Sequence, residues 1–395
     1  MTARPLRLAP LLATLALAGC STLSSWIPSI PVPSLSSISW MWGGGTKKLG
    51  PLPEITATAT AQAVWQVPVG KAAPGLAPAV VADAIYAAAT DGTVVRVDPA
   101  TGRTAWRIAA GKRLAAGVGA DPTIVVVGTD KGDVLAFDPD GKSLWTSRVS
   151  SEVVSPPDVA EGVVAVWSGD GRLYGLSSAD GKTKWVYQRA NPPLTVRNYA
   201  GGVISRGGVF VGTAGGKLIA LDLATGRVGW EGSVATPRGA TELERIADVT
   251  SLPVIEPTQA CAVAFQGRVA CFEITRGTLV WSRDISSLEG IVVDNRHLYV
   301  TDDRSTVHAL DKTTGATVWK QELLKERRLG GPQIAGDFVA AVDGEGYVHL
   351  LDRNNGKVVG RMATDGSPAT TQPAASAGNA VFLSTNGTLF AVTGR

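Results

Sequence analysis

Residues that commonly carry catalysis or bind metals are scarce in this chain of 395 residues, which has only three histidines and three cysteines. His308 and His349 occupy the same place in two similar segments, Val-His-Ala and Val-His-Leu. A metal-binding pair is one interpretation, but a position repeated along a strand favours a structural role. We therefore expect no metal site, no cofactor and no catalytic residue.

Two cysteines, Cys261 and Cys271, flank a predicted hairpin at Phe265-Gln266-Gly267. If the hairpin loop has three residues, residue 264 faces residue 268 and the two cysteines face each other. A disulfide can then form in an oxidising compartment. A two-residue loop would offset the pair by one position and favour two free thiols, and the sequence leaves both interpretations open.

The third cysteine, Cys20, follows a segment with the features of an export signal over residues 1–19. Arg4 and Arg7 precede an apolar run from Leu8 to Leu17, which is too short to span a bilayer. The run ends in Leu17-Ala18-Gly19-Cys20, which resembles the bacterial lipobox. The resemblance implies cleavage before Cys20 and a diacylglycerol on its sulfur. The alternative is a signal without lipidation and a chance cysteine.

A lipidated Cys20 would anchor the chain to a membrane without spanning it. Ser21, rather than aspartate, follows the cysteine. By resemblance to the sorting rule of Gram-negative lipoproteins, serine indicates the periplasmic face of the outer membrane. Residues 20–62 are rich in Ser, Pro and Gly, which predicts a flexible tether. Within the tether, Trp26, Trp40 and Trp42 suit either a membrane interface or a contact with the folded domain.

Charge gives no case for nucleic-acid binding, because 37 basic residues nearly balance 34 acidic ones. The apolar content of 45% is too high for a disordered chain. One basic cluster, at Lys325, Arg327 and Arg328, predicts a solvated loop, with contact to a lipid headgroup or a partner as the alternative.

Residues 63–395 consist of one repeated unit. In each unit a Gly-containing turn precedes an alternating strand, then often Asp, a Thr-Gly pair and a Trp, as from Asp91 to Trp106. The unit recurs about every 40 residues, which is the size of a four-stranded propeller blade. The alternation predicts antiparallel strands, the last of which carries the tryptophan. The fold class is therefore an all-β propeller.

The two ends of the repeat array complement each other. The last repeat ends at Gly394 before any tryptophan, whereas Trp65 precedes the first full repeat. The segment from Ala63 to Val67 should therefore complete the last blade and close a ring of eight. Gly360 stands where an eighth tryptophan would be, so that interface should be filled differently or be weaker. The other positions predict tryptophans packed between neighbouring blades: Trp65, Trp106, Trp145, Trp185, Trp230, Trp281 and Trp319.

The unit Gly-x-hydrophobic-x-Ala-Leu-Asp-x-x-Thr-Gly-x-x-x-Trp resembles the tryptophan-docking repeat of quinoprotein alcohol dehydrogenases. With its lipobox, tether and lone eight-bladed propeller, the chain resembles the BamB family of propeller lipoproteins in the outer-membrane β-barrel assembly machinery. The resemblance covers residues 20–395. It implies a non-catalytic periplasmic scaffold that assists the folding and insertion of β-barrel proteins. Its implied partners are BamA, the other subunits, and unfolded client proteins bound by strand addition.

Two consecutive tryptophan intervals, Trp185 to Trp230 and Trp230 to Trp281, are longer than the others. The surplus follows the tryptophan in both, which predicts two enlarged neighbouring loops on one rim, residues 192–199 and 241–253. Both resemble the family's loops that contact a POTRA domain of BamA. The resemblance assigns this contact to Leu194, Val196, Arg197, Glu244, Arg245 and Asp248.

The second loop departs from the family pattern at one position. The family often has a second acid two residues after Asp248, where this chain has Thr250. Asp248 is therefore the main carboxylate candidate. In the alternative interpretation, Arg197 and Asp248 pair with each other and only hold the two loops together.

Two other classes of function remain as alternatives. A quinoprotein-type dehydrogenase would need a quinone site and commonly a vicinal disulfide, but the chain has no Cys-Cys pair and no long insertions. A periplasmic glycan- or peptide-binding propeller would use the central funnel. Aromatic side chains at the funnel mouth would support that interpretation.

Overall fold

The computed structural model describes residues 49–190, 192–196, 201–369 and 372–395. The predicted signal segment, Cys20, the three tether tryptophans and Arg197 lie outside these residues. All regular elements in the described ranges are β-strands. No helix long and apolar enough to cross a membrane occurs there.

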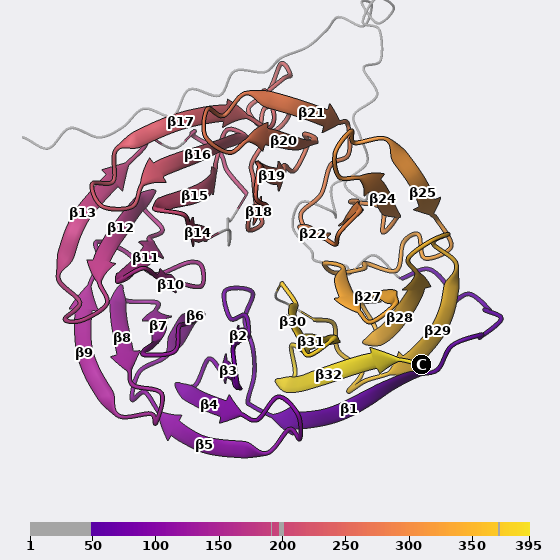
Figure 1. The fold of residues 1–395 in the computed structure, drawn as a ribbon, viewed down its shortest axis with the longest axis horizontal. Helices are drawn as coiled ribbons and strands as arrows, with labels where there is room; N and C mark the ends of the chain where they lie inside the picture. Colours follow the sequence, from indigo (N-terminus) through magenta and orange to yellow (C-terminus); the bar gives the residue numbers. More distant parts are fainter. Residues whose placement is uncertain (1–48, 191, 197–200, 370–371) are drawn as a thin grey trace, which may run out of the picture. The chain divides into compact units, whose positions relative to one another are not determined.

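The strands form eight four-stranded antiparallel sheets, arranged as the blades of a ring (Figure 1). Blades 1 to 4 comprise β2 (Ala79–Val81), β3 (Ala84–Ala88), β4 (Thr93–Val97) and β5 (Thr104–Ala109); β6 (Leu114–Ala120), β7 (Val125–Thr129), β8 (Asp133–Phe137) and β9 (Ser143–Arg148); β10 (Asp158–Ala160), β11 (Val163–Trp167), β12 (Arg172–Ser177) and β13 (Thr183–Gln188); and β14 (Gly202–Ser205), β15 (Gly208–Thr213), β16 (Lys217–Asp222) and β17 (Val228–Ser233).

Blades 5 to 7 follow the same order from the innermost strand to the outermost one. They comprise β18 (Val254–Ile255), β19 (Gln259–Val263), β20 (Val269–Glu273) and β21 (Leu279–Arg283); β22 (Ile291–Val293), β23 (His297–Thr301), β24 (Val307–Asp311) and β25 (Thr317–Gln321); and β26 (Gln333–Ala335), β27 (Phe338–Val342), β28 (Tyr347–Asp352) and β29 (Val358–Ala363). We call the four strands of a blade a, b, c and d from the inside outwards.

Blade 8 joins both ends of the chain. It comprises β30 (Ala374–Ser376), β31 (Asn379–Leu383), β32 (Thr388–Gly394) and, as its outer strand, β1 (Ala61–Pro68). Antiparallel pairing places Ala61 opposite Gly394 and Pro68 opposite Thr388. The predicted eight-bladed ring, closed by the N-terminal strand, is confirmed.

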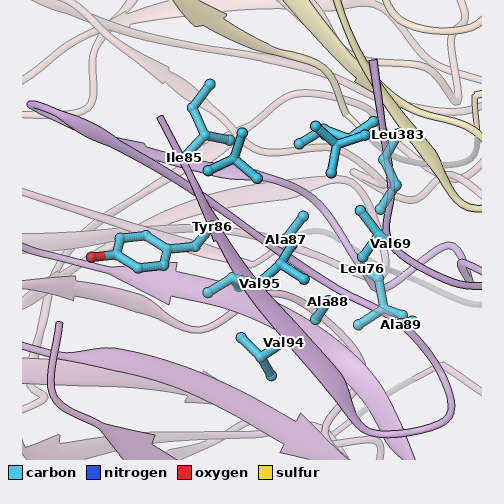
Figure 2. Close-up of a cluster of buried hydrophobic side chains, with 14 of the residues drawn as sticks. Val69, Leu76, Ile85, Tyr86, Ala87, Ala88, Ala89, Val94, Val95 and Leu383 are labelled. Atoms are coloured by element: carbon cyan, nitrogen blue, oxygen red, sulfur yellow. The ribbon is translucent and has the colours of Figure 1, made fainter. Parts of the chain in front are cut away.

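The middle strands of each blade are buried on both faces because neighbouring blades pack against both sides. Strand β3 is accordingly a continuous apolar run, Ala-Ile-Tyr-Ala-Ala, and all five residues are buried. In blade 1, Ile85 and Val95 belong to a cluster that also includes Val127 of blade 2 and Leu383 of blade 8 (Figure 2). The core is therefore distributed around the ring, between the blades, rather than gathered at one centre.

Each predicted tryptophan anchor joins its blade to the next one. Trp185 Nε1 donates a hydrogen bond to the Leu223 carbonyl in the following blade at 2.7 Å. Its ring lies against Gly226, where a Cβ atom would come within 2.7 Å of it. Gly226 also has a positive φ of 69°, which favours glycine. The same bond, at 2.7–3.0 Å, is made by Trp65, Trp106, Trp145, Trp185, Trp230, Trp281 and Trp319.

The interface after Gly360 is filled differently, as predicted. The Phe338 ring takes the place against Gly394, where a Cβ atom would lie 2.3 Å from the ring. At Gly360 itself, a Cβ atom would lie 2.8 Å from the Ala59 carbonyl oxygen. Backbone from before β1 therefore occupies the space next to the missing tryptophan.

Residues 49–60, here named the N-terminal strap, lie against blades 6 and 7. The N–H groups of Thr58 and Ala59 both donate to the Val359 carbonyl at 2.9 Å. Ile55 packs on the hydrophobic cluster between these blades. The predicted flexible tether extended to residue 62, whereas in the structure residues from 49 to 60 are bonded to the propeller and β1 begins at Ala61.

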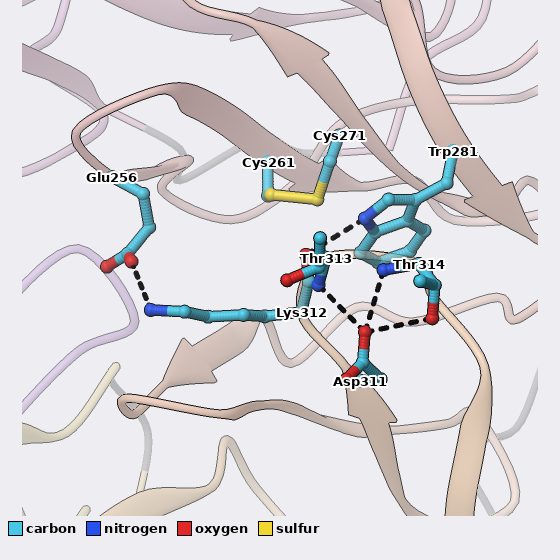
Figure 3. The surroundings of a disulfide bond; sticks show 8 residues. All are labelled: Glu256, Cys261, Cys271, Trp281, Asp311, Lys312, Thr313 and Thr314. Carbon is cyan, nitrogen blue, oxygen red and sulfur yellow. Dashed lines mark hydrogen bonds and ion pairs between the residues drawn. A yellow bond between two sulfur atoms is a disulfide. The ribbon is translucent and has the colours of Figure 1, made fainter.

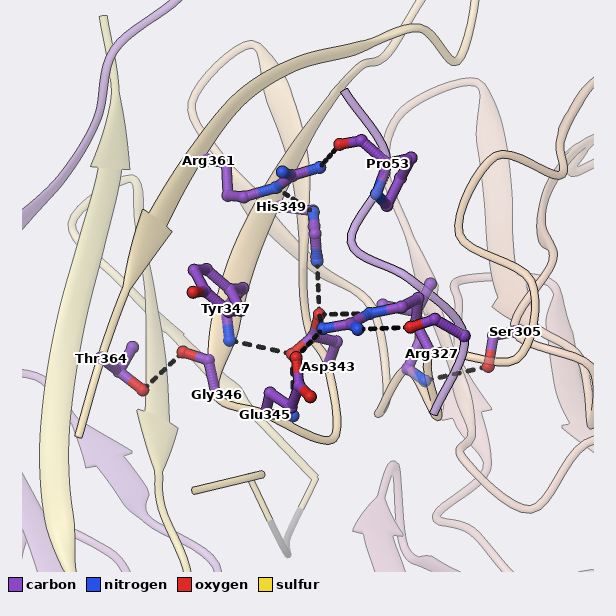
Figure 4. Close-up of polar contacts among 12 residues, drawn as sticks. Pro53, Ser305, Arg327, Asp343, Glu345, Gly346, Tyr347, His349, Arg361 and Thr364 are labelled. Atoms are coloured by element: carbon purple, nitrogen blue, oxygen red, sulfur yellow. Dashed lines mark hydrogen bonds and ion pairs between the residues drawn. The ribbon is translucent and has the colours of Figure 1, made fainter. Parts of the chain in front are cut away.

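A buried ionic cluster holds the strap (Figure 4). Arg327, only 1% exposed, donates to Asp343 at 2.7 and 3.0 Å, to Glu345 at 2.7 Å and to the Gly50 carbonyl at 2.7 Å. His349 Nε2 lies 2.9 Å from Asp343 Oδ2. Arg361 bridges His349 Nδ1 and the Pro53 carbonyl. The prediction of a solvated basic loop is thus wrong at Arg327, whose charge is needed to compensate Asp343.

Cys261 and Cys271 form a disulfide within blade 5 (Figure 3). They stand directly opposite each other on β19 and β20, as the three-residue loop requires. Neighbouring Trp281 donates to the Lys312 carbonyl of blade 6 at 3.0 Å. The disulfide therefore links the two strands of the β19–β20 hairpin, next to the contact that Trp281 makes with blade 6.

Candidate partner-binding face

One face of the ring carries the turns between strands b and c together with the connections from strand d to the next blade. Backbone bonds join the two sets: the Val149 N–H donates to the Gly132 carbonyl at 2.8 Å, and the Val234 N–H donates to the Gly216 carbonyl at 2.9 Å. We name this side the loop face. Its two longest d-to-a connections are residues 189–201 and 234–253, which agrees with the prediction from tryptophan spacing.

Asp248 fastens these two connections together. Its side chain is buried, with 1% of the residue exposed. Oδ2 accepts a hydrogen bond from the Val196 N–H at 2.7 Å, and Oδ1 accepts one from the Gly215 N–H at 2.8 Å. Burial raises the pKa of Asp248, and the two backbone bonds oppose the rise.

The sequence predicted that Asp248 itself faces a partner. In the structure both of its oxygens are engaged by backbone, so the side chain positions the loops instead of presenting a free carboxylate. Arg197, the residue proposed to pair with it, lies outside the described residues.

A single helical turn shapes the tip of the second connection. Glu244 Oε2 accepts hydrogen bonds from the N–H groups of Ala240 at 2.7 Å and Thr241 at 3.1 Å, and Thr241 Oγ1 accepts from the Glu244 N–H at 3.3 Å. This reciprocal arrangement is a capping box, and the backbone bonds lower the pKa of Glu244. The signal Thr-x-x-Glu was present in the sequence at 241–244. Arg245 bonds Glu242 at 3.2 Å and the Gly239 carbonyl at 3.1 Å.

The loops leave apolar side chains free while their charged groups are occupied. Leu243, at the tip of the capped turn, is 65% exposed, and Leu194 in the first connection is 44% exposed. Val196 is half-buried and contributes its backbone N–H to Asp248. The candidate contact residues in the described part are therefore mainly Leu194 and Leu243. In the second loop the resemblance had assigned the contact to Glu244, Arg245 and Asp248, and Leu243 was not among the assigned residues.

Other candidate sites find structural explanations. His308 Nε2 lies 2.9 Å from Asp302 and His349 Nε2 lies 2.9 Å from Asp343, so each histidine braces the b–c turn of its own blade. Within the described residues, no three His, Cys, Asp or Glu side chains gather as a metal site would require. The innermost strands that surround the funnel contain no aromatic residue, which disfavours a glycan-binding funnel.

Comparison with known proteins decides the family. A family model described as "Outer membrane protein assembly factor BamB" matches residues 90–321 and 303–395. A protein of that same name from Nitrosomonas eutropha is 46% identical over 284 residues, covering 72% of this chain and 69% of its own length. The chain belongs to the BamB family. It is accordingly a propeller component of outer-membrane protein assembly.

Structural neighbours agree with the BamB assignment. The crystal structure of BamB from Moraxella catarrhalis superposes with a TM-score of 0.77 at 25% identity, covering 85% of this chain and all of that one. A quinohemoprotein alcohol dehydrogenase from Pseudomonas putida HK5 reaches a TM-score of 0.68 at 12% identity, covering 87% of this chain and 78% of its own. The second likeness shows the fold alone. BamB relatives are named as assembly factors, so the dehydrogenase interpretation is not favoured.

Proposed function

We propose that this chain is a lipid-anchored scaffold on the periplasmic face of the outer membrane, which binds the POTRA region of BamA through its loop face. The family membership and the lipobox ending at Cys20 support this location. No catalytic step is assigned to it. It assists barrel folding by holding the assembly machinery in a fixed arrangement.

One observation carries the choice of surface. Buried Asp248 joins the two longest connections through Val196, and the platform around this link exposes Leu194 and Leu243. Apolar anchors on a preorganised backbone bind with a small loss of conformational entropy. The partner surface should therefore offer an apolar groove to these two leucines.

The test is binding of full-length BamA in detergent to the mature lipoprotein. Replacing Leu194 and Leu243 together by serine should weaken binding by about tenfold or more, the range expected when hot-spot side chains are lost. The matched control replaces Val228 and Leu279, which are similarly exposed on outer strands. If the folded Leu194→Ser, Leu243→Ser variant bound BamA with wild-type affinity, the two leucines would not form the contact site. If the wild-type protein did not bind BamA, the assignment of BamA as its partner would be wrong.

The anchor needs its own experiment. A Cys20→Ala variant should leave the membrane fraction after export, while the wild-type protein should be recovered there with its acyl chains detectable by mass spectrometry. A membrane-bound variant without acyl chains would contradict the lipobox interpretation.

A second contact, with unfolded client proteins, is supported by the outer strands. In each blade strand d is the terminal strand of its sheet, and among the described residues no further strand pairs with its outer edge, although Val359 in blade 7 accepts hydrogen bonds from the strap. Exposed apolar side chains accompany these edges, among them Leu144, Val186 and Leu279. Such an edge can accept an extended segment by strand addition. Photo-crosslinkers at these positions should capture client chains during export, and crosslinks confined to the loop face would contradict this role.

A further inference from the structure

The large apolar side chains exposed on the described residues fall into two groups. One group lies on strands d and is spread around the ring: Val64, Leu144, Val186, Val228, Leu279, Val280 and Val318. All the others are leucines on the loop face: Leu194, Leu243, Leu288 and Leu323. These four occupy four consecutive connections between blades, from the one after blade 3 to the one after blade 6. Exposed leucines gathered on one face are typical of an interaction surface.

Leu288 stands next to the second enlarged connection. The hydroxyl of Thr250 donates to the Leu288 carbonyl at 3.4 Å, and the Gln266 N–H donates to Ser286 Oγ at 2.8 Å. The Ser287 hydroxyl donates to the Thr301 carbonyl at 2.6 Å. Leu288 is 41% exposed although its backbone is held in this way. It is therefore a preorganised apolar contact, continuous with the platform built around Asp248.

The residue after Leu288 is an exposed acid, Glu289. Among the described residues, the carboxylate of Glu289 has no hydrogen-bond or ion-pair partner. Packing of the protein around the carboxylate raises the pKa of Glu289, and the negative charge of Asp303 adds to the rise. Asp303 itself accepts a hydrogen bond from Ser286. This part of the face therefore pairs an apolar side chain with an acid that lacks a counter-charge.

We propose that the BamA-binding surface continues from Leu194 and Leu243 to Leu288, where the same partner places an apolar group next to a basic side chain that pairs with Glu289. This inference rests on the proposed function. Charge complementarity selects the occupant, since a lysine or arginine on the partner would compensate both Glu289 and Asp303. Variants in which the side chain of Leu288 is truncated, or the acid of Glu289 is replaced by an amide, should bind BamA more weakly without disturbing the fold.

The experiment measures the affinity of full-length BamA for the mature lipoprotein. Leu288→Ser and Glu289→Gln should each weaken binding by about threefold to tenfold, and Glu289→Lys should weaken it more than Glu289→Gln. Two matched controls should bind like the wild type: Leu279→Ser, a similarly exposed leucine on an outer strand, and Asp337→Asn, an exposed carboxylate in a turn between strands a and b. Equal melting temperatures verify that the variants are folded.

The outcomes separate this inference from the proposed function. If the variant lacking Leu194 and Leu243 binds weakly while Leu288→Ser and Glu289→Gln bind like the wild type, the contact through Leu194 and Leu243 is supported. Its extension to Leu288 and Glu289 is then overturned. If Glu289→Lys binds more tightly than the wild type, the partner is acidic there and the charge assignment is overturned. If the wild-type protein does not bind BamA, the proposed function fails and this inference fails with it.

Discussion

The carboxylate of Asp248 accepts a hydrogen bond at 2.7 Å from the backbone N–H of Val196, 52 residues earlier in the chain. Its second oxygen accepts from Gly215. One buried side chain therefore fixes the two connections that distinguish this propeller's loop face.

Asp248→Asn should loosen that link. An amide has one oxygen acceptor, so one of the two buried N–H groups loses its partner, at a cost of about 1–3 kcal/mol. Hydrogen exchange at Val196 or Gly215 should accelerate by about tenfold or more. The exposed carboxylate Asp337 provides the control, Asp337→Asn. Unchanged protection at both amides would show that Asp248 does not hold the loops.

Arg327→Met should destabilise the ring because it leaves Asp343 buried without the guanidinium group that donates two hydrogen bonds to it. The expected loss in unfolding free energy is about 3 kcal/mol, the usual scale for breaking one side of a buried ion pair. Denaturant unfolding measures it. Lys325→Met removes an exposed pair with Glu322 and should cost less than about 1 kcal/mol. Equal losses in the two variants would contradict the assigned role of Arg327.

Gly360→Trp, which restores the repeat consensus, should destabilise the protein. The space beside Gly360 is already occupied by the strap at Ala59, so an indole would displace it, at a cost of about 1–3 kcal/mol. Thermal unfolding and proteolysis of the strap are the measurements. Lys357→Trp, at an exposed position nearby, is the control. A higher melting temperature for Gly360→Trp would show that the slot is empty.

Acid should weaken the contact between blades 6 and 7 at Asp294. Burial disfavours its ionised form, but hydrogen bonds from the His297 and Arg296 N–H groups, Arg353 and Tyr299 outweigh burial and lower the pKa of Asp294 to about 2. A depressed acid pKa contributes stability above the unfolded value near 4, and this contribution of about 2 kcal/mol disappears as pH falls from about 4 to about 2. Asp294→Asn should flatten the stability profile in that window. An identical profile for the variant would contradict the prediction.

Repetition explains why the ring was predictable and its exceptions were less so. The spacing from Trp65 to Trp319 determines the blade count because the units repeat the same hairpins and seven of the eight make the same indole bond. By contrast, Arg327 reaches Gly50 across 277 residues, and Arg361 reaches Pro53 across 308. Contacts that distant occur once and leave no period in the sequence. The strap was therefore assigned to the tether, and Arg327 to the surface.

The candidate site shows the same division. Loop length could be read from the tryptophan intervals, and the capping box from Thr241 and Glu244. The burial of Asp248 could not be predicted, because the sequence does not show whether an acid in a long loop faces solvent or two backbone amides. Exposed Leu288 was missed because its connection is short and its spacing ordinary.

The N-terminal strap also determines how the propeller bears mechanical load. A pull on the chain ahead of Leu49 reaches the carbonyls of Gly50 and Pro53 before it reaches β1. The guanidinium groups of Arg327 and Arg361 would therefore take up the first strain. Strand β1, which closes the ring, follows these contacts in the chain. Tension on the N-terminal chain therefore has to break the hydrogen bonds of Arg327 and Arg361 before it can separate β1 from blade 8.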